Sequence, residues 1–421
     1  MRILWLCNII LPAVAVKMGL KPSDKEGWVL GAASAFSGEG DYQLGIAFPV
    51  PSEQEDFRLS ENGTEYFGFF EDTAHPEIYD EGLEDRLRVI VKEFKPDIVH
   101  IFGTEYPHTL AMTRVFKDDP GRILIGLQGV MDIYKDHYFD GLPEYVINRV
   151  TFRDFVRRDS LKTQQKKYAL RAENEVKSIK AAVNITGRTA FDRNASEAIN
   201  PDIKYHFMNE TLRKNFYDLP TEPVVKEPYS IFISQGNYPI KGAHYMLSAL
   251  RLLKAEFPSA RLYIAGDNIT RHETLKDKIK ISSYGKYLLE LMDRNDLWDC
   301  VVFTGSLNAE KYRERLLRSS IFVCPSSIEN SPNSLGEAML LKVPCVSARV
   351  GGIPSIFDDG RDGILYEPGD VNGLKEGVAR MWRNPDMASE FAEHAREHAL
   401  ITHDAAGNIA RLKEIYNSMK H

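Results

Sequence analysis

Short apolar runs alternate with longer helical segments along almost the whole chain of 421 residues. This alternation predicts parallel sheets covered by helices, with the loops at the carboxyl ends of the strands forming the working edge. The expected fold class is therefore α/β, with two Rossmann-like doubly wound domains. In the first half, strands are expected at residues 3–7, 43–48, 98–102, 123–127 and 181–185, and helices at 82–94, 107–116 and 166–180.

The chain is too long for one ordinary hydrophobic core, so two domains of about 200 residues are expected. Residues 217–228 carry three prolines and little periodicity, which makes them the best linker candidate. The expected domains are residues 1–217 and residues 229–402. In the second domain, strands are expected at 229–234, 261–265, 300–303, 321–324 and 344–347, helices at 242–256, 273–294 and 309–318, and mostly helix at 371–420.

Composition narrows the function classes. Apolar residues make up 43% and charged residues 27% of the chain, as in soluble globular proteins, and the net charge of −7 argues against a nucleic-acid partner. The four cysteines have neither disulfide nor zinc spacing.

The first sixteen residues could pass for a signal peptide, but Asn8 and Pro12 interrupt the apolar run, so a buried strand is favoured. We expect a cytoplasmic protein that could work at the inner face of the membrane.

The most informative stretch is residues 321–341, where an apolar run, a polar loop and a helix start follow one another. Pro332 suits the first helical turn, with Ser331 as its N-cap. A helix N-terminus presents free N–H groups and the positive end of the helix dipole, so it can hold an anion such as a diphosphate. Glu329 and Glu337 flank this turn, and carboxylates accept hydroxyl hydrogen bonds. A nucleotide sugar, with phosphates between two polyols, fits this pattern.

Further motifs accompany this pair of glutamates. They are Ser-Gln-Gly-Asn-Tyr-Pro-Ile-Lys-Gly at 234–242, Leu-Tyr-Ile-Ala-Gly-Asp at 262–267, Val-Phe-Thr-Gly at 302–305, Gly-Gly-Ile-Pro at 351–354 and Asp-Gly-Ile-Leu-Tyr at 362–366. Together they resemble the retaining nucleotide-sugar glycosyltransferases of family 4, group 1 glycosyltransferases with the GT-B fold. The resemblance implies two domains facing across a cleft, and a last helix at about 403–421 that packs back on the first domain.

The resemblance also implies roles for individual residues. The first glutamate of the family pattern touches the donor sugar and the second touches the ribose hydroxyls. The catalytic residues implied here are Glu329, Lys241 and Gln128. The donor-binding residues implied are Glu337, Asn330, Ser331, Asn333, Ser334, Gly236, Asn237, Thr304 and Gly305. Each residue also has an ordinary interpretation. Glu329 could be a surface glutamate, Glu337 an ordinary helix glutamate and Lys241 a solvated loop lysine, and the glycines could simply form turns.

Several positions depart from the family pattern. Asn237 stands near the place of an arginine that shares the diphosphate charge in the family, and Gln128 stands where the family often has a histidine. Glutamine can hydrogen-bond but cannot act as a general base at neutral pH. His100 and Glu105 could face the cleft or be structural polar residues. Residues 26–28, Glu-Gly-Trp, resemble the family's entry to the first long helix.

Residues 149–171 hold eight basic residues against two acidic ones, with Arg149, Arg153 and Arg157 at four-residue steps. A basic amphipathic helix can lie on an anionic membrane, although a solvated helix face explains the same pattern. No Asp-x-Asp sequence occurs, so we expect no metal site and no cofactor.

The expected function is transfer of a sugar, with retention, from a nucleoside diphosphate sugar to a saccharide or lipid-linked saccharide. The synthesis of a cell-surface polysaccharide or glycolipid would use such a step. A GT-B sugar-nucleotide epimerase or hydrolase, and a sugar-nucleotide-binding protein without catalysis, remain alternatives.

Overall fold

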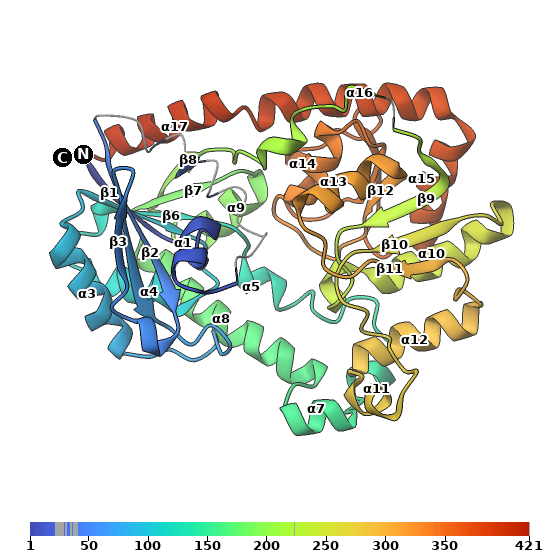
Figure 1. The fold of residues 1–421 in the computed structure, drawn as a ribbon, viewed down its shortest axis with the longest axis horizontal. Coiled ribbons are helices and arrows are strands. Elements are labelled where there is room, and N and C mark those ends of the chain that lie inside the picture. Colours follow the sequence, from blue (N-terminus) through green and yellow to red (C-terminus); the bar gives the residue numbers. More distant parts are fainter. Residues whose placement is uncertain (22–28, 30–31, 34–35, 37–40, 223, 421) are drawn as a thin grey trace. The chain divides into compact units, whose positions relative to one another are not determined.

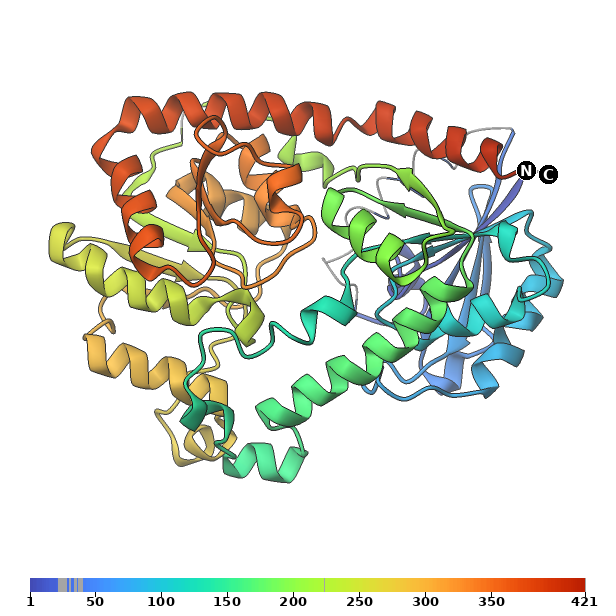
Figure 2. The same cartoon turned by 180° about the vertical axis from the view of Figure 1, so that it is seen from behind.

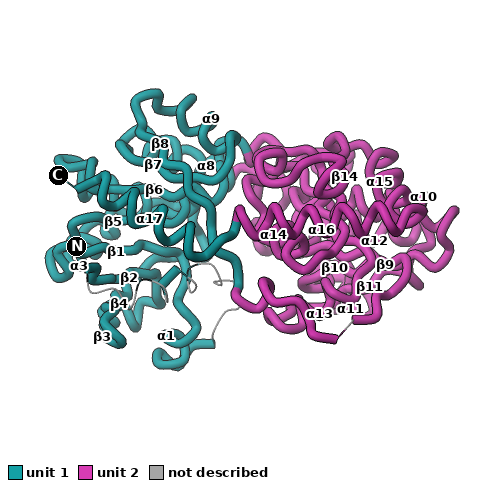
Figure 3. The backbone as a smooth tube through the Cα atoms, turned by 90° about the horizontal axis from the view of Figure 1, so that it is seen from above, with its two compact units in different colours: residues 1–133, 167–213, 403–421 teal, residues 134–166, 214–402 magenta. Residues whose placement is uncertain are grey.

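The computed structural model describes residues 1–21, 29, 32–33, 36, 41–222 and 224–420. The chain forms two compact units (Figure 3). Unit 1 comprises residues 1–133, 167–213 and 403–421, and unit 2 comprises residues 134–166 and 214–402. Residues 134–166 thus pack with unit 2, whereas a division at residue 217 groups them with the first half.

Unit 1 is built on an eight-stranded sheet in the order β3-β4-β2-β1-β5-β6-β7-β8. Its neighbouring strands are parallel except β3, which runs antiparallel to β4. The strands are β1 Arg2–Leu6, β2 Gln43–Val50, β3 Arg58–Glu61, β4 Thr64–Phe70, β5 Ile98–Phe102, β6 Ile123–Gly126, β7 Asn184–Gly187 and β8 Lys204–Phe207. The central strands β1 and β5 are almost wholly buried because helices cover both faces of a sheet of this kind.

The helices of unit 1 lie on both faces of its sheet (Figures 1 and 2). They are α1 Pro12–Lys17, α3 Gly82–Phe94, α4 Pro107–Val115, α9 Ala190–Ile199, α17 Ala405–Ser418 and most of α8 Leu161–Ala181. On one face Trp5 and Phe48 pack with Tyr416 of α17, and on the other Leu6 packs with Leu87 of α3. The Trp5 Nε1–H donates a hydrogen bond to the Tyr416 hydroxyl (2.9 Å), which ties the last helix to β1.

Unit 2 contains a six-stranded parallel sheet in the order β11-β10-β9-β12-β13-β14. The strands are β9 Glu227–Ile233, β10 Arg261–Ile264, β11 Val301–Phe303, β12 Ser319–Cys324, β13 Cys345–Ala348 and β14 Gly363–Tyr366. The helices are α10 Ala243–Glu256, α11 Leu275–Lys280, α12 Ser283–Asn295, α13 Ala309–Arg318, α14 Asn333–Leu340, α15 Val371–Arg383 and α16 Pro385–Thr402. Both units are therefore doubly wound α/β domains, which confirms the predicted fold class.

The segment 134–166 belongs to unit 2 because side chains anchor it there. Its short helices are α6 Glu144–Ile147 and α7 Phe152–Arg157, after α5 Met131–Tyr134. His244 Nε2 donates to the Asp140 carbonyl (3.1 Å), and the backbone N–H of Ser283 donates to the carboxylate of Asp154 (2.9 Å).

Two predicted helices are interrupted. Residues 273–294 form α11 and α12, because Ser282 starts a new helix by accepting a hydrogen bond from the N–H of Gly285. The basic stretch 149–171 contains α7 and part of α8, separated at Arg158, whose φ of 51° is left-handed and cannot continue a helix. The predicted single basic helix is therefore wrong.

In the described part of the chain, no helix has the length and apolar composition needed to cross a membrane.

Candidate functional site

The loops that follow β9 and β12 are in direct contact at the carboxyl edge of the unit 2 sheet. After β9 the chain makes a 3-10 turn, η4 (Pro239–Lys241), and then reaches Gly242 with a left-handed φ of 69°. A Cβ atom on Gly242 would lie 1.8 Å from the carbonyl oxygen of Pro325, so only glycine allows the two loops to approach this closely. The Ser327 N–H donates to the Ile240 carbonyl (2.8 Å) and joins the loops further.

This contact brings Lys241 and Glu329 together across 88 residues of sequence. Lys241 Nζ donates to Glu329 Oε1 (2.5 Å), and the Ser326 hydroxyl donates to the same oxygen (2.7 Å). The exposed fractions of the two charged side chains are 19% and 9%, so the pair lies at a partly enclosed edge. Burial opposes the charge on Lys241, but the Glu329 carboxylate outweighs it and raises the pKa of Lys241 well above its usual value. The lysine is therefore a fixed cation.

The loop after β13 also contacts Glu329, through the glycine pair Gly351-Gly352, which packs against the Glu329 backbone. The Gly352 N–H donates to the Glu329 carbonyl (3.0 Å). At Gly351, where φ is 49°, a Cβ atom would lie 2.0 Å from that carbonyl. Three loops, after β9, β12 and β13, therefore fix the position of one carboxylate.

The helix that follows this carboxylate begins without a side-chain cap. α14 starts at Asn333 with Pro332 as the N-cap residue, and no cap hydrogen bond forms there among the described residues. The prediction of Ser331 as N-cap and Pro332 inside the first turn is therefore wrong by one position. The N–H groups of Leu335 and Gly336 donate to the Pro332 carbonyl (2.9 and 3.4 Å). The N–H groups of Asn333 and Ser334 lie before this first bond and have no acceptor within the helix, so they can serve a ligand. In the described part of the chain, the Asn333 Oδ1 atom is buried and has no hydrogen-bond partner.

The other residues predicted for this turn are mostly inaccessible to solvent. Glu337 is 4% exposed and Asn330 is 1% exposed, and Ser331 is buried as well, while Ser334 is half-buried. A glutamate buried in the second turn of α14 differs from the solvated helix glutamate of the ordinary interpretation.

One residue that sequence reasoning missed joins the same cluster. Tyr134, at the end of α5, has its hydroxyl hydrogen-bonded to the backbone of Asn330, and the charges of Glu329 and Lys241 act on it. Burial and the Glu329 carboxylate raise the pKa of Tyr134 well above its usual value, so it is a neutral hydroxyl. No motif marks Tyr134, because the segment 134–166 reaches unit 2 only through tertiary packing.

The remaining predicted donor residues lie on the neighbouring strand ends. The Thr304 N–H donates to the Ile264 carbonyl (2.9 Å), and the Gly266 N–H donates to the Gly305 carbonyl (3.0 Å), which joins the ends of β10 and β11. Gly236 lies close to Ile264, because a Cβ atom there would be 2.7 Å from the isoleucine side chain. Asn237 is exposed and lines a cavity of about 520 Å³.

In unit 1, Gln128 lies just beyond β6 within a network of polar side chains. Its Nε2 donates to Glu210 (2.5 Å), and Glu210 also forms an ion pair with Arg188, whose side chain is 5% exposed. The network occupies the hydrogen-bonding groups of Gln128 with neighbouring protein atoms. This arrangement favours a structural or positioning role for Gln128 over direct contact with the reacting atoms.

The other first-domain candidates have structural surroundings. His100 is fully buried, its Nδ1 lies 2.7 Å from the Tyr416 hydroxyl, and burial lowers its pKa to about 3. His100 is therefore a neutral core residue, which contradicts a role at the ligand edge. Burial raises the pKa of Glu105, and Arg171 Nε donates to its carbonyl (2.9 Å). Residues 26–28 lie outside the described residues.

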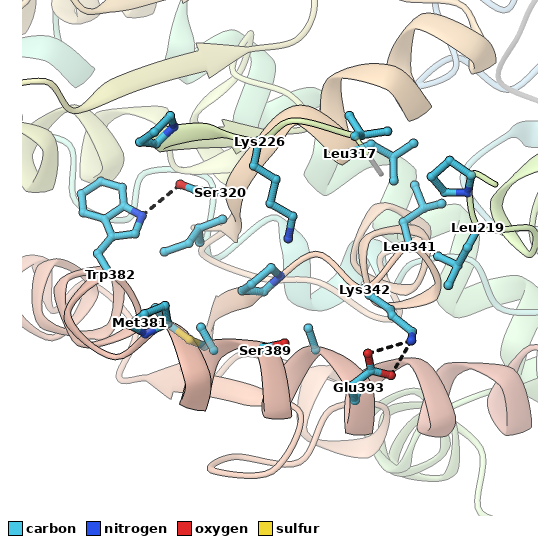
Figure 4. A pocket seen from close by; sticks show the side chains of 18 of the residues that line it. Leu219, Lys226, Leu317, Ser320, Leu341, Lys342, Met381, Trp382, Ser389 and Glu393 are labelled. Carbon is cyan, nitrogen blue, oxygen red and sulfur yellow. Dashed lines mark hydrogen bonds and ion pairs between the residues drawn. The ribbon is translucent and has the colours of Figure 1, made fainter. Parts of the chain in front are cut away.

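Two large cavities lie away from the Lys241–Glu329 pair. One, of about 680 Å³, is found where β9, β12 and β13 begin, at the amino edge of the unit 2 sheet (Figure 4). Lys226 extends into it, and Trp382 closes one wall by donating to the Ser320 hydroxyl (3.0 Å). The other, of about 640 Å³, lies in unit 1 beside Asn8 and Glu71, at the carboxyl edge of its sheet, where ligands of such domains bind.

One group of side chains in the described part of the chain has spacing compatible with a metal ion, namely Asp358, Asp362 and His398. Asp362 is fully buried, and its Oδ2 lies 2.6 Å from His398 Nδ1 and accepts from the Asp358 N–H (2.8 Å). The hydrogen bond to Asp362 raises the pKa of His398 and fastens α16 to the turn before β14.

Residues 218–398 match the family model described as "Glycosyl transferases group 1". Similar curated proteins include the N-acetyl-alpha-D-glucosaminyl L-malate synthase of Bacillus anthracis, 25% identical over 52% of this chain and 54% of that protein. The alpha-D-kanosaminyltransferase of Streptomyces kanamyceticus is 24% identical over 65% of this chain and 66% of that protein. The chain thus spans between about half and two thirds of the length of these relatives.

Solved structures resemble the chain over nearly its full length. The sucrose-phosphate synthase of Thermosynechococcus elongatus has a TM-score of 0.71 at 12% identity, covering 100% of this chain and 99% of that one. The Anabaena protein Alr3699/HepE in complex with UDP and glucose has a TM-score of 0.67 at 14% identity, covering 99% and 100%. The chain therefore has the two-domain fold of the GT-B glycosyltransferases, and its residues 218–398 are similar to the group 1 glycosyl transferases.

Proposed function

We propose that the protein transfers a sugar from a nucleoside diphosphate sugar to an acceptor hydroxyl, with retention at the anomeric carbon. One observation carries the proposal: a permanently charged lysine lies against a buried carboxylate, just before a helix whose N-terminus has no side-chain cap. A fixed cation and unpaired N–H groups at one sheet edge suit the diphosphate of such a donor.

The donor would lie with its diphosphate between Lys241 and the first turn of α14. Glu337 would accept the ribose hydroxyls, and Asn333 Oδ1 would gain a partner that it lacks in the described part of the chain. Glu329 would hold Lys241 in place and contact the sugar. The family match over residues 218–398 and the solved complex of HepE with UDP and glucose support this placement.

The same groups would lower the barrier to transfer. As the bond from the anomeric carbon to the phosphate oxygen breaks, negative charge grows on the departing diphosphate. Lys241 keeps its proton throughout, so it stabilises this charge more than that of the bound donor. None of the predicted residues is a secure general base, which is consistent with front-face transfer, in which the leaving phosphate takes the acceptor proton.

The acceptor would be a saccharide or a lipid-linked saccharide bound by unit 1. Its cavity of about 640 Å³ combines apolar walls, from Ile9, Ile10 and Phe70, with the exposed carboxylate of Asp72. The neighbouring Glu71 carboxylate is held by His108. Carboxylates at an apolar surface are typical of sugar-binding sites, since they accept hydroxyl hydrogen bonds while sugar C–H groups pack on the walls.

Calorimetry of the purified chain with UDP-, GDP- and ADP-sugars tests the proposal, with and without EDTA. We expect one donor class to bind, equally in EDTA, because we propose that the cation and helix terminus act without a metal ion. Glu337→Ala should weaken binding about 10- to 100-fold, as expected for loss of a hydrogen bond to a charged group. Glu390→Ala, which changes an exposed glutamate of α16, is the matched control.

Unchanged donor affinity in Glu337→Ala would refute the assignment. Incubation of the bound donor with an acceptor panel then tests transfer, and NMR of the product reports the anomeric configuration. Donor turnover without any acceptor would indicate an epimerase or hydrolase. Binding without turnover on any acceptor would indicate a sugar-nucleotide-binding protein.

A further inference from the structure

The short helix α7 carries its apolar side chains outward. Phe152, Phe155 and Val156, at positions i, i+3 and i+4 and therefore on one helix face, are 65%, 74% and 62% exposed. The buried side holds a carboxylate instead: Asp154 accepts the N–H of Ser283 and completes a capping box with Thr151. The helix is thus firmly anchored through its polar side, and its apolar side faces solvent.

The helix α11 repeats this arrangement. Leu275 and Ile279, one turn apart, are 80% and 52% exposed. A capping box between Thr274 and Asp277 closes its first turn, and no residue of α11 is buried. Both helices therefore expose apolar side chains, which a helix in a globular domain normally buries.

The two helices pack against each other within unit 2, and Figure 1 shows them side by side, distant from the sheet. Both helices line the cavity of about 520 Å³ that Asn237 also lines: Arg157 of α7 and Lys280 of α11 are among its lining residues. These two neighbouring helices, with Val150 just before α7, are called the α7–α11 surface below, and their exposed apolar side chains lie on adjacent elements.

The two helices also carry exposed cations. The exposed basic residues on or beside the two helices are Arg157, Arg158, Lys276, Lys278 and Lys280. The acidic residues there are fewer: Glu273 is exposed, Asp159 is half-buried and paired with Arg153, and Asp277 caps α11. The net charge of the whole chain is −7, so a positive surface here is a local feature.

We propose that the α7–α11 surface docks the protein onto an anionic lipid bilayer. Large apolar side chains beside lysine and arginine suit the boundary between acyl chains and negative headgroups. This contact differs from the predicted one, which used a single basic helix covering residues 149–171. Two arginines of that stretch already have acidic partners: Arg149 pairs with Glu290 (2.8 Å) and Arg153 with Asp159 (3.1 Å). The apolar side chains of two helices make the contact, and the neighbouring cations select the lipid.

Sedimentation of the full chain with phosphatidylcholine vesicles, with and without phosphatidylglycerol, tests the proposal. We expect binding to the anionic vesicles, weakened by salt because screening acts on exposed charges. Phe152→Ser/Phe155→Ser and Leu275→Ser/Ile279→Ser should each reduce partitioning about tenfold or more. Val225→Ser/Ile401→Ser is the matched control, since these side chains of unit 2 are 86% and 78% exposed and lie outside the surface; its partitioning should stay unchanged.

Equal partitioning of all variants, or no binding of the unaltered protein to anionic vesicles, would overturn the proposal. Light scattering tests whether a second copy of the chain binds this surface instead. A dimer that is lost in the Phe152→Ser/Phe155→Ser variant would identify the surface as an interface between copies of this chain. Donor affinity should be unchanged in every variant, because none of these residues belongs to the Lys241–Glu329 site. Failure of lipid docking and failure of the proposed transfer are therefore separate results.

Discussion

The carboxyl edges of the two sheets use polar residues in opposite ways. In unit 2, Lys241 and Glu329 form a pair beside an uncapped helix, and Asn333 keeps a buried oxygen without a partner among the described residues. In unit 1, Gln128 and Glu210 bond to each other at the equivalent edge. The polar groups at the two edges therefore have different surroundings: a cation and an uncapped helix N-terminus in unit 2, and other side chains in unit 1.

The buried carboxylate of Glu175 extends this contrast within unit 1. It is fully buried on α8, it accepts the Asp132 N–H (2.9 Å) and the Thr104 hydroxyl, and burial raises its pKa to about 7. Glu329, by comparison, is held against a cation. A carboxyl group whose pKa is raised to about 7 by burial suits a structural role, whereas Glu329 lies beside a cation at the sheet edge.

The largest expected effect breaks the contact between the loops of unit 2. Gly242→Ala places a Cβ atom against the Pro325 carbonyl at a left-handed φ, so we expect it to cost about 3 kcal/mol or more of unfolding free energy. Donor binding should also be lost, because Lys241 would shift. Gly360→Ala is the control: its φ of 72° is similar but the space around it is open, so it should cost about 1 kcal/mol. Equal urea midpoints for the two variants would contradict this explanation.

The next effect concerns pH and unit 1. The pKa of Glu175 is raised to about 7 by folding, so the native state binds a proton that the unfolded state releases above about pH 4.5. Its contribution to stability is present below that pH and is lost as pH rises to about 7. Glu175→Gln should therefore gain stability relative to the unaltered protein over this window, by up to about 3 kcal/mol.

Urea unfolding at a series of pH values measures this gain. Glu173→Gln, an exposed glutamate two residues away on α8, is the control and should show no such trend. A stability difference between Glu175→Gln and the unaltered protein that does not change with pH would show that Glu175 is ionised in the folded state.

The smallest expected effect concerns Gln128, and it compares the carboxyl edge of unit 1 with that of unit 2. Gln128→Leu removes one hydrogen bond to Glu210, which keeps its ion pair with Arg188, so we expect a loss of about 1 kcal/mol in stability. Donor affinity should stay within about twofold, whereas Lys241→Met should weaken it about 100-fold because a charged contact is lost. If Gln128→Leu leaves stability unchanged but abolishes transfer, Gln128 acts at the reaction centre and the contrast between the two edges fails.

Local patterns were enough to predict long elements. Helices at residues 82–94 and 309–318 have the predicted bounds, because apolar residues recur at helical spacing over several turns. Short strands such as β3 and β8 were missed, since four residues carry little periodicity. The predicted helix at 273–294 failed at Ser282, where a serine competes with the helix by capping a new one.

The sequence by itself determined the α/β alternation, the strand–loop–helix at residues 319–340 and the residue types that suit a diphosphate, because these depend on neighbours within a few turns of chain. Tertiary structure alone decided that Tyr134 joins Glu329, that residues 134–166 pack with unit 2, and that α7 lies against α11. Such contacts join segments over a hundred residues apart. They depend on which strands become neighbours and on how closely glycines let loops approach, and local sequence patterns do not encode either.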